Sequence, residues 1–328
     1  MASRVDELIF QHCLRTGRPY FGVVMAAGQG VRSRHGYMRR LVQYLIAQRP
    51  GRPFKVLEIG SWAGGSAITW ARAIRDSGAS GGTVVCVDPW VSYVNVDVNA
   101  NRADENDVYV EMESALRRGE VVDLFRHNIR AGRVADLVVA IRGSSRDVLP
   151  RFFDGEFDLV YVDGDHVYES VKQDLTDAAR LVAPGGALCG DDLEVQLSAV
   201  EPAYVRARME RELILDPATG CRFHGGVTLA VGEFFRCDVT SRDGFWAMQK
   251  SEDGWLWFEQ VDFSGVQVPA HLRDFTPGFH YAAATTLMRL NRLDDAVTVL
   301  EAVLRARPED AAARSKLAAV ERRRCAVA

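Results

Sequence analysis

Two groups of chemically active side chains each follow a short apolar segment of this sequence. Segment 163–166 reads Asp-Gly-Asp-His and comes directly after the apolar run 157–162. A second acidic pair, Asp191 and Asp192, comes directly after the short run 187–190. Carboxylates that meet at one point repel each other, and a divalent cation relieves that repulsion. Carboxylate oxygens and water suit Mg²⁺, Ca²⁺ or Mn²⁺, so the pattern predicts a cation site with an imidazole beside it.

The elements around these segments must bring them together. Apolar, β-rich runs alternate with segments of helical spacing, which predicts a doubly wound, mainly parallel α/β sheet covered on both faces. The carboxyl ends of parallel strands lie at one edge of the sheet, with neighbouring strands about 5 Å apart. The acidic groups are therefore expected to converge there. Strands are predicted at 55–59, 83–87, 137–141, 157–162 and 187–190.

The last strands of the sheet are expected to reverse direction. Runs 227–231 and 245–249 are both apolar, and the residues between them leave no room for a crossover helix. Parallel neighbours need such a crossover, whereas antiparallel strands do not. We therefore predict that both runs are strands and that they form an antiparallel pair at the sheet edge.

A glycine-rich loop follows the first predicted strand and precedes a predicted helix. Its spacing is acid-x-Gly-x-x-x-Gly, with the acid at Glu58 and the glycines at Gly60 and Gly64. Gly60 permits a sharp turn, and Gly64 lets a ligand approach the backbone at the helix N-terminus. A dinucleotide site would require G-x-G-x-x-G and a phosphate loop G-K-[ST], and this loop has neither. Asp88, at the end of the next strand, is the expected acceptor for the two hydroxyls of a ribose.

This loop resembles the first motif of the class I S-adenosylmethionine-dependent methyltransferases. The resemblance covers roughly residues 55–249 and includes the Pro-Gly-Gly at 184–186. It implies a Rossmann-like sheet with an antiparallel edge strand, S-adenosyl-L-methionine as the cofactor, and a contact to the adenine side after the third strand. The cofactor-binding residues that it implies are Glu58, Gly60, Ser61, Gly64, Ser66, Asp88, Ser144 and Asp163.

The two acidic segments carry a more specific resemblance. The string D-G-D-x-x-Y-E-S at 163–170 and the later G-D-D at 190–192 are most similar to the macrocin-type, metal-dependent sugar O-methyltransferases of natural-product pathways. In that resemblance Asp163, Asp191 and Asp192 hold Mg²⁺ or another divalent cation. It implies an O-methyltransferase whose acceptor is a hydroxyl of a sugar or another small natural-product intermediate.

Methyl transfer to a hydroxyl also needs a base. In the resemblance Asp165 has that role, and His166 is its rival because the ordinary pKa of an imidazole suits proton transfer better. Three other functions stay open. The acids could cap the following helix in a metal-independent methyltransferase. Asp-x-Asp could hold a metal-bound nucleotide in a glycosyltransferase, or the chain could be a non-catalytic protein that recruits partners.

Composition limits the remaining choices. The 328 residues include 40 basic and 44 acidic side chains, and the net charge of -4 argues against a dedicated nucleic-acid binder. Segment 8–57 contains nine Arg or Lys and no acid, so it is either a solvated helical face or a wall that holds an anionic substrate. Segment 93–123 is expected to form another wall. The six cysteines form no C-x-x-C pair and no run is long enough to cross a bilayer, so we expect a cytoplasmic protein that binds no membrane.

Three parts of the chain are expected. Residues 1–54 form a helical lid segment, residues 55–263 the S-adenosylmethionine-binding domain, and residues 264–328 a linker and a small α-helical segment. The last part resembles one tetratricopeptide unit, in which two helices pack through small residues. Because such units normally stack about three deep, this one is expected to pack on the catalytic domain or on a second chain, and we expect a homodimer.

Overall fold

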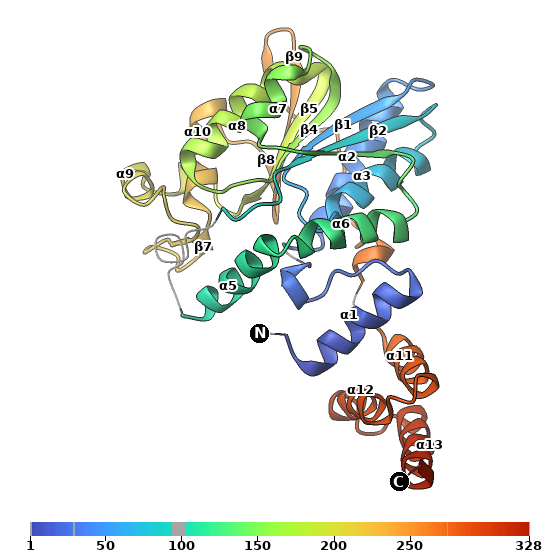
Figure 1. Cartoon of the computed structure of the whole chain (residues 1–328). Coiled ribbons are helices and arrows are strands. Elements are labelled where there is room, and N and C mark those ends of the chain that lie inside the picture. The colour runs from blue at the N-terminus through green and yellow to red at the C-terminus, as the bar shows by residue number, and fades with distance from the viewer. Residues whose placement is uncertain (1, 29, 94–102, 274, 328) are drawn as a thin grey trace.

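A twisted, mainly parallel sheet lies at the centre of the fold, with helices on both faces (Figure 1). The computed structural model describes residues 2–28, 30–93, 103–273 and 275–327. The strands of this sheet are β1 (Phe54–Ile59), β2 (Gly82–Asp88), β3 (Val138–Arg142), β4 (Phe157–Val162), β5 (Val182–Leu193), β8 (Thr240–Arg242), β9 (Gly244–Ser251) and β10 (Gly254–Trp257). Their order is β10-β9-β5-β4-β1-β2-β3, and β8 pairs with β9. Strands β1 to β5 are parallel and β9 is antiparallel to β5, so the predicted fold is confirmed.

Helices cover the two faces of the sheet as separate apolar cores. Strand β4 is buried along its whole length, as a strand covered on both faces should be. Alternation along β1 sends Val56 into one core and Leu57 into the other. The first core is covered by α2 (Arg34–Gln48) and α3 (Gly65–Asp76), and the second by α8 (Tyr168–Leu181) and α10 (Gly225–Phe235). Other elements are α1 (Arg4–Thr16), α5 (Ala103–Arg117), α6 (Glu120–Ala131), α7 (Ser145–Val148), α9 (Pro202–Arg206) and the pair β6 (Ile214–Leu215) and β7 (Arg222–Phe223).

Residues 227–231 lie in helix α10, so the prediction that they form a strand is wrong. A short apolar run does not distinguish a buried strand from a buried helix, and residues 225–231 are all buried. Gly226 brings this helix against the loop that follows β4, because a Cβ at Gly226 would lie 2.2 Å from the carbonyl oxygen of His166. The sheet edge is formed by β9 and β10 instead. The start of α10 is therefore held next to the acidic strand ends.

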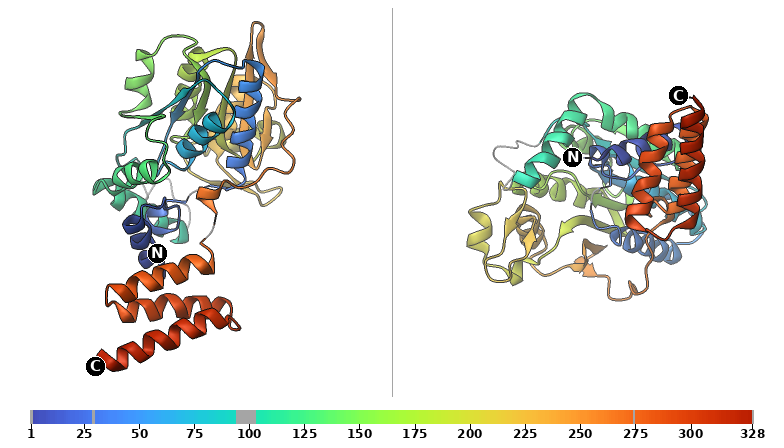
Figure 2. Two further views of the ribbon diagram at one scale, coloured as in Figure 1. Left: turned by 90° about the vertical axis from the view of Figure 1, so that its right-hand side faces the viewer. Right: turned by 90° about the horizontal axis from the view of Figure 1, so that it is seen from below.

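Three helices extend from one end of the molecule and pack with the N-terminal helix (Figure 2). They are α11 (Pro277–Arg289), α12 (Leu293–Ala306) and α13 (Ala311–Val327). Leu8 of α1 belongs to the same apolar cluster as Ala284, Leu300 and Val320 of these helices. An ion pair of 2.8 Å between Arg4 and Asp295 lies at the edge of this contact. Helix α1 thus supplies an apolar surface that the short helical segment lacks, and the predicted boundaries at 54 and 263 stay predictions.

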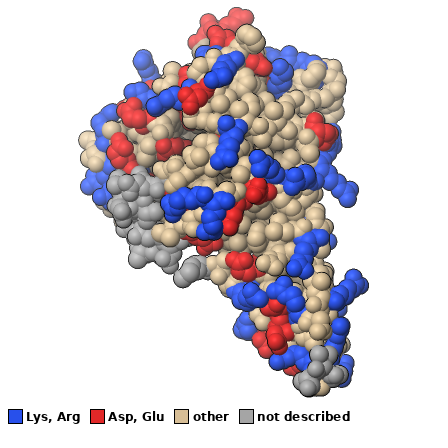
Figure 3. All heavy atoms as spheres, in the orientation of Figure 1, with Lys and Arg blue, Asp and Glu red and all other residues tan. Residues whose placement is uncertain are grey.

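The surface carries both charges in close alternation. On the face shown in Figure 3, Lys and Arg lie interspersed with Asp and Glu on the sheet domain and on the helical extension. This agrees with the small net charge of -4. Among the described residues, each helix is too short or too polar to span a bilayer.

Two partly buried histidines weaken the fold at acid pH. Desolvation lowers the pKa of His35 to about 3 and that of His271 to about 4, so both are neutral in the folded protein. In the unfolded chain they take up protons near pH 6.5, so their own contribution to the free energy of unfolding should fall as the pH drops from about 6.5 towards 4. Carboxyl groups with raised pKa values, such as Glu58 and Asp191, contribute with the opposite sign. Urea unfolding should therefore show that His271→Gln loses less stability, or gains more, between pH 6.5 and 4 than the parent does, and an identical pH dependence would contradict the assignment.

Candidate active site

A cavity of about 650 Å³ lies at the carboxyl ends of the central strands. Its lining includes Phe21, Gly28 and Arg34 from the N-terminal segment, which forms one wall as expected for a lid. Tyr109 and Met112 of α5 form part of another. Residues 94–102 of the second predicted wall lie outside the described part of the chain. The acidic strand ends and the glycine-rich loop share this one cavity.

The glycine-rich loop turns sharply because two of its residues have left-handed backbone angles. Gly60 has φ +82°, and a Cβ there would lie 1.9 Å from the carbonyl oxygen of Asp163, so no larger residue fits. Gly64 has φ +85° and stands at the N-terminus of α3. The non-glycine residue Trp62 between them has φ 43°, a strained value of the kind found at ligand sites.

Asp88 ties the second strand to this loop. Its Oδ2 accepts hydrogen bonds from the backbone amides of Ser61, at 2.9 Å, and Trp62, at 3.0 Å. Its Oδ1 accepts one from the amide of Trp90 at 2.6 Å. Burial raises the pKa of Asp88, and these three amides oppose the shift. The side chain lines the cavity, as its predicted role toward a ribose requires.

The other predicted cofactor residues divide between the cavity wall and the layer beneath it. Glu58 is fully buried, and burial raises its pKa to about 7, against the hydroxyls of Ser61 and Ser66. Ser66 also lines the cavity. Ser144 does so as well, and its hydroxyl caps α7 by accepting from the amide of Asp147 at 3.2 Å. Glu58 therefore lies in the layer beneath the cavity wall, next to the serines of the loop.

The predicted metal ligands converge at the ends of two neighbouring strands. Val162 of β4 pairs with Gly190 of β5, so Asp163 and Asp191 are the next residues along the two strands. Burial and repulsion from Asp191 and Asp192 raise the pKa of Asp163 well above its ordinary value. Burial and the charge of Asp192 likewise raise the pKa of Asp191 to about 6. This part of the site is short of positive charge.

Arg34 supplies one buried positive charge to the cluster. Its side chain is 4% exposed and comes from the start of α2. One guanidinium nitrogen lies 2.6 Å from Asp191 Oδ1 and 2.8 Å from Asp192 Oδ1, and the other lies 3.1 Å from Glu194. The backbone carbonyl of Asp243 accepts from its Nε. The guanidinium is therefore fixed between the two acidic residues that end β5.

The two candidate bases differ in their surroundings. Asp165 accepts from the amide of Val167 at 3.2 Å and from the hydroxyl of Ser170 at 2.6 Å, so it holds the start of α8. His166 lies between two carboxylates, with Nδ1 at 2.6 Å from Glu212 and Nε2 at 3.0 Å from Asp192. Burial disfavours the imidazolium, but these two carboxylates outweigh it and raise the pKa of His166 well above its ordinary value. The two carboxylates therefore favour the imidazolium form of His166.

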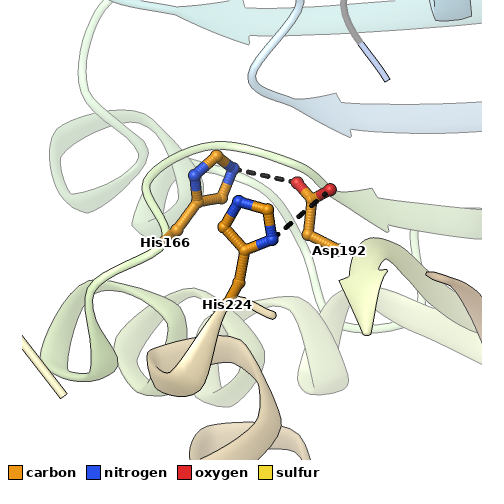
Figure 4. A group of neighbouring side chains, drawn as sticks. All are labelled: His166, Asp192 and His224. Atoms are coloured by element: carbon orange, nitrogen blue, oxygen red, sulfur yellow. Dashed lines mark ion pairs between the residues drawn. The ribbon is translucent and has the colours of Figure 1, made fainter. Parts of the chain in front are cut away.

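A second imidazole lies beside the first, and both rings point towards Asp192 (Figure 4). The ring centroids of His166 and His224 are 4.5 Å apart. His224 directly precedes α10, and its Nδ1 lies 3.2 Å from Glu194 and 3.8 Å from Asp192. Burial opposes the charge on Asp192, but both histidines and Arg34 hold its pKa well below the ordinary range.

Comparison with known proteins decides what kind of domain holds this cavity. Residues 57–193, from the end of the first strand to the end of β5, match the family described as methyltransferase domain. The centre of this chain is a methyltransferase domain. The resemblance noted for the glycine-rich loop is thereby confirmed. Residues 277–320 match the tetratricopeptide repeat family, which agrees with the predicted helical unit.

Individual relatives of the methyltransferase domain are distant. A Streptomyces olivaceus protein, 8-demethyl-8-(2,3-dimethoxy-alpha-L-rhamnosyl)-tetracenomycin-C 4'-O-methyltransferase, is 27% identical over 146 residues, or 44% of this chain. The chain spans 55% of that relative's length. An O-methyltransferase from Bacillus cereus bound to SAH is 18% identical, covers 78% of this chain and 88% of its own, and has a TM-score of 0.40. TomG from Streptomyces achromogenes, bound to SAM, is 19% identical, covers 76% and 91%, and has a TM-score of 0.37.

Three residues of the site were not predicted from the sequence, and all three lie outside the matched residues 57–193. Arg34 had a signal, because segment 8–57 carries basic residues and no acid. His224 and Glu212 follow the matched region and lie far from segment 163–166 along the chain. The sequence around His224, two glycines followed by the apolar run 227–231, did not indicate a role in the site.

Proposed function

We propose that this chain is an S-adenosylmethionine-dependent O-methyltransferase whose acceptor is a hydroxyl of a small molecule, such as a sugar or a natural-product intermediate. The observation that carries the proposal is the shared cavity of the methyltransferase domain. The glycine-rich loop and Asp88 line one part of it, and Asp163, Asp165 and Asp192 line another. The O-methyltransferase activity named for the Streptomyces olivaceus relative supports the same reaction class.

The cofactor part of the cavity would bind S-adenosylmethionine, which supplies an electrophilic methyl group. Gly60 and Gly64 allow the sharp turn of the loop, and Asp88 would accept hydrogen bonds from the ribose. A carboxylate has about four lone-pair positions, and the three amides on Asp88 leave room for a hydroxyl. The protein's contribution is to align the methyl group with the acceptor oxygen.

The proton of the acceptor would pass to Asp165. His166 is a poorer candidate because both of its ring nitrogens already face carboxylates, Glu212 and Asp192, which favour its protonated form. Asp165 lines the cavity, and Val167 and Ser170 hold its carboxylate in place. Accepting these two hydrogen bonds and accepting a proton are compatible, since each carboxylate oxygen has a second lone pair.

A divalent cation belongs to this proposal, with Mg²⁺ as the ion expected from the sequence. Asp163, Asp191 and Asp192 would hold it, and it would lower the pKa of the acceptor hydroxyl. The donor set fits in charge, because burial, together with repulsion between the carboxylates, raises the pKa values of Asp163 and Asp191, and a cation would oppose both effects. Arg34 takes part of the space, since it already contacts Asp191 and Asp192. That contact favours a second candidate, a methyltransferase in which Arg34 replaces the metal.

Binding measurements with different nucleotide ligands test the proposed function. S-adenosylhomocysteine should raise the Tm, whereas NAD should not, and UDP with Mg²⁺ should not. Stabilisation by UDP and Mg²⁺ alone would instead support a glycosyltransferase. Repeating the series with Mg²⁺ and with EDTA separates the metal-dependent from the metal-independent candidate.

Asp88→Asn should weaken S-adenosylhomocysteine binding about 10- to 100-fold. Hydrogen bonds to a charged acceptor are worth about 1.5–3 kcal/mol, and the amide side chain loses that charge. Isothermal titration calorimetry measures the effect. Asp136→Asn, an exposed acid paired with Arg75, is the matched control and should bind normally. Equal affinity in both variants would remove Asp88 from the cofactor site.

Two further sequence-based expectations stay proposals. We propose a homodimer, which light scattering can test, and a cytoplasmic location, which fractionation of the native cells can test. Neither is needed for the site described above.

A further inference from the structure

We propose that His166, Asp192 and His224 form a binding site for a first-row transition-metal dication such as Zn²⁺, Fe²⁺ or Co²⁺. The inference rests on the proposed function in one respect: the cation would bind in the cavity in which methyl transfer is proposed. It adds the residues that would hold the cation and the class of metal. It differs from the three-aspartate site in containing two imidazoles. Imidazole nitrogen suits these metals, whereas Mg²⁺ prefers oxygen alone.

The three side chains are close enough to share an ion. One ligand atom from each lies within 4.8 Å of the others. His166 Nε2 is 3.0 Å from Asp192 Oδ2, and His224 Nδ1 is 3.8 Å from Asp192 Oδ1. Metal–ligand bonds of about 2.1 Å at a tetrahedral angle place two ligand atoms about 3.4 Å apart. The two separations involve different oxygens of Asp192 and lie on both sides of that value, so side-chain movements that bring His224 to the same oxygen as His166 would complete the site.

A carboxylate behind His166 supports the assignment. Glu212 lies 2.6 Å from Nδ1 of His166, whereas Glu194 lies 3.2 Å from Nδ1 of His224, the same nitrogen that faces Asp192. Histidines that bind metals commonly donate their second ring N–H to a carboxylate, which orients the ring and strengthens it as a ligand. The amide of His224 also donates to Glu194, at 3.2 Å. For His166, this arrangement leaves Nε2 directed at Asp192.

The two carboxylate oxygens of Asp192 have different partners. Oδ1 of Asp192 accepts from the guanidinium at 2.8 Å, while Oδ2 faces His166. The same guanidinium nitrogen lies 2.6 Å from Asp191, which commits that carboxylate to the arginine. An oxygen-only site would compete with Arg34 for Oδ1 of Asp191 and Oδ1 of Asp192. A site built from His166, His224 and Oδ2 of Asp192 leaves Arg34 where it is.

The three ligands come from rigid and separate elements. His166 follows β4, Asp192 lies near the end of β5 with φ 60°, and His224 precedes α10. The close packing of Gly226 on the backbone of His166 fixes the position of α10 relative to the other two. All three ligands line the cavity, so further coordination positions would face it and could take an acceptor oxygen.

Cobalt binding tests the site without any methyl-transfer assay. After treatment with EDTA and its removal, the full chain should bind Co²⁺ and show visible d–d absorption bands. Zn²⁺ should abolish the bands at equal concentration, whereas a hundredfold excess of Mg²⁺ should not. His166→Ala and His224→Ala should each weaken Co²⁺ binding about 100-fold or more, and Glu212→Gln about 10- to 100-fold. The matched control His280→Ala, on α11, should bind as the parent does.

Asp163→Asn separates the two donor sets. It should keep the Co²⁺ bands, because Asp163 is outside the proposed set. Loss of the bands in Asp163→Asn, or their survival in His224→Ala, would overturn the inference. Calorimetry with S-adenosylhomocysteine on every variant reports on folding and on the cofactor site. If the parent chain did not bind S-adenosylhomocysteine, the methyltransferase proposal would be contradicted. The cobalt spectra would still test the metal site, because they do not depend on cofactor binding.

Discussion

Arg34→Met should lower the free energy of unfolding by about 3–5 kcal/mol. Removing one partner of a buried ion pair leaves the others uncompensated, which costs about that amount. Arg34 is 4% exposed and neutralises Asp191, Asp192 and Glu194 together. Methionine keeps much of the aliphatic length, so the change measures charge more than packing. Urea unfolding at pH 7 gives the number directly.

Arg39→Met is the matched control for this prediction. Arg39 lies on the same helix, is 35% exposed, and reaches Asp76 only at 4.0 Å. Exposed pairs of this kind contribute about 0–1 kcal/mol. If the two variants unfold at the same urea concentration, Arg34 does not organise the acidic strand ends.

Asp192→Asn should lower kcat about 10³-fold while leaving the affinity for S-adenosylhomocysteine within about threefold. Asp192 touches Arg34, His166 and His224, so the loss of its charge disturbs both candidate cation sites. Losses of this size follow when a group that stabilises developing charge is removed. Asparagine tolerates the left-handed backbone of this position, φ 60°, so the fold should survive. Transfer of a labelled methyl group to an acceptor found by metabolite screening measures kcat, and calorimetry measures affinity.

The same measurements on Asp238→Asn control for the loss of a carboxylate elsewhere. Asp238 accepts from the hydroxyl of Ser198 at 2.9 Å on an exposed part of the chain. Its kcat should match that of the parent. Full activity in Asp192→Asn would exclude this carboxylate from catalysis, with or without a metal.

Much of the fold could be predicted because each strand and helix is encoded by a hydrophobic pattern within its own few residues. Strands such as 157–162 are apolar runs that end in polar residues, and their alternation with helices leads to a parallel sheet. The glycine-rich loop could be recognised for the same reason, since Gly60 and Gly64 meet steric needs set within a few residues. The convergence of Asp163 with Asp191 followed from strand direction alone.

The rest of the site could not be predicted because it depends on contacts between distant segments. His166 could not be assessed as a base without Glu212, which sets its protonation from 46 residues away. Arg34 reaches Asp192 across 158 residues. The error at 227–231 has a related cause, because that helix is buried on all sides and its apolar run has no polar face to reveal a helical period.

The contact between the first helix and the last three links the cavity wall to the helical repeat. Leu8 completes the apolar cluster of α11 to α13, and only a short connection separates α1 from the wall residues that begin at Phe21. Loosening α1 would therefore expose apolar surface of α11 to α13, and the reverse also holds. A movement of these three helices would reach the cavity wall through α1 and the short segment that follows it.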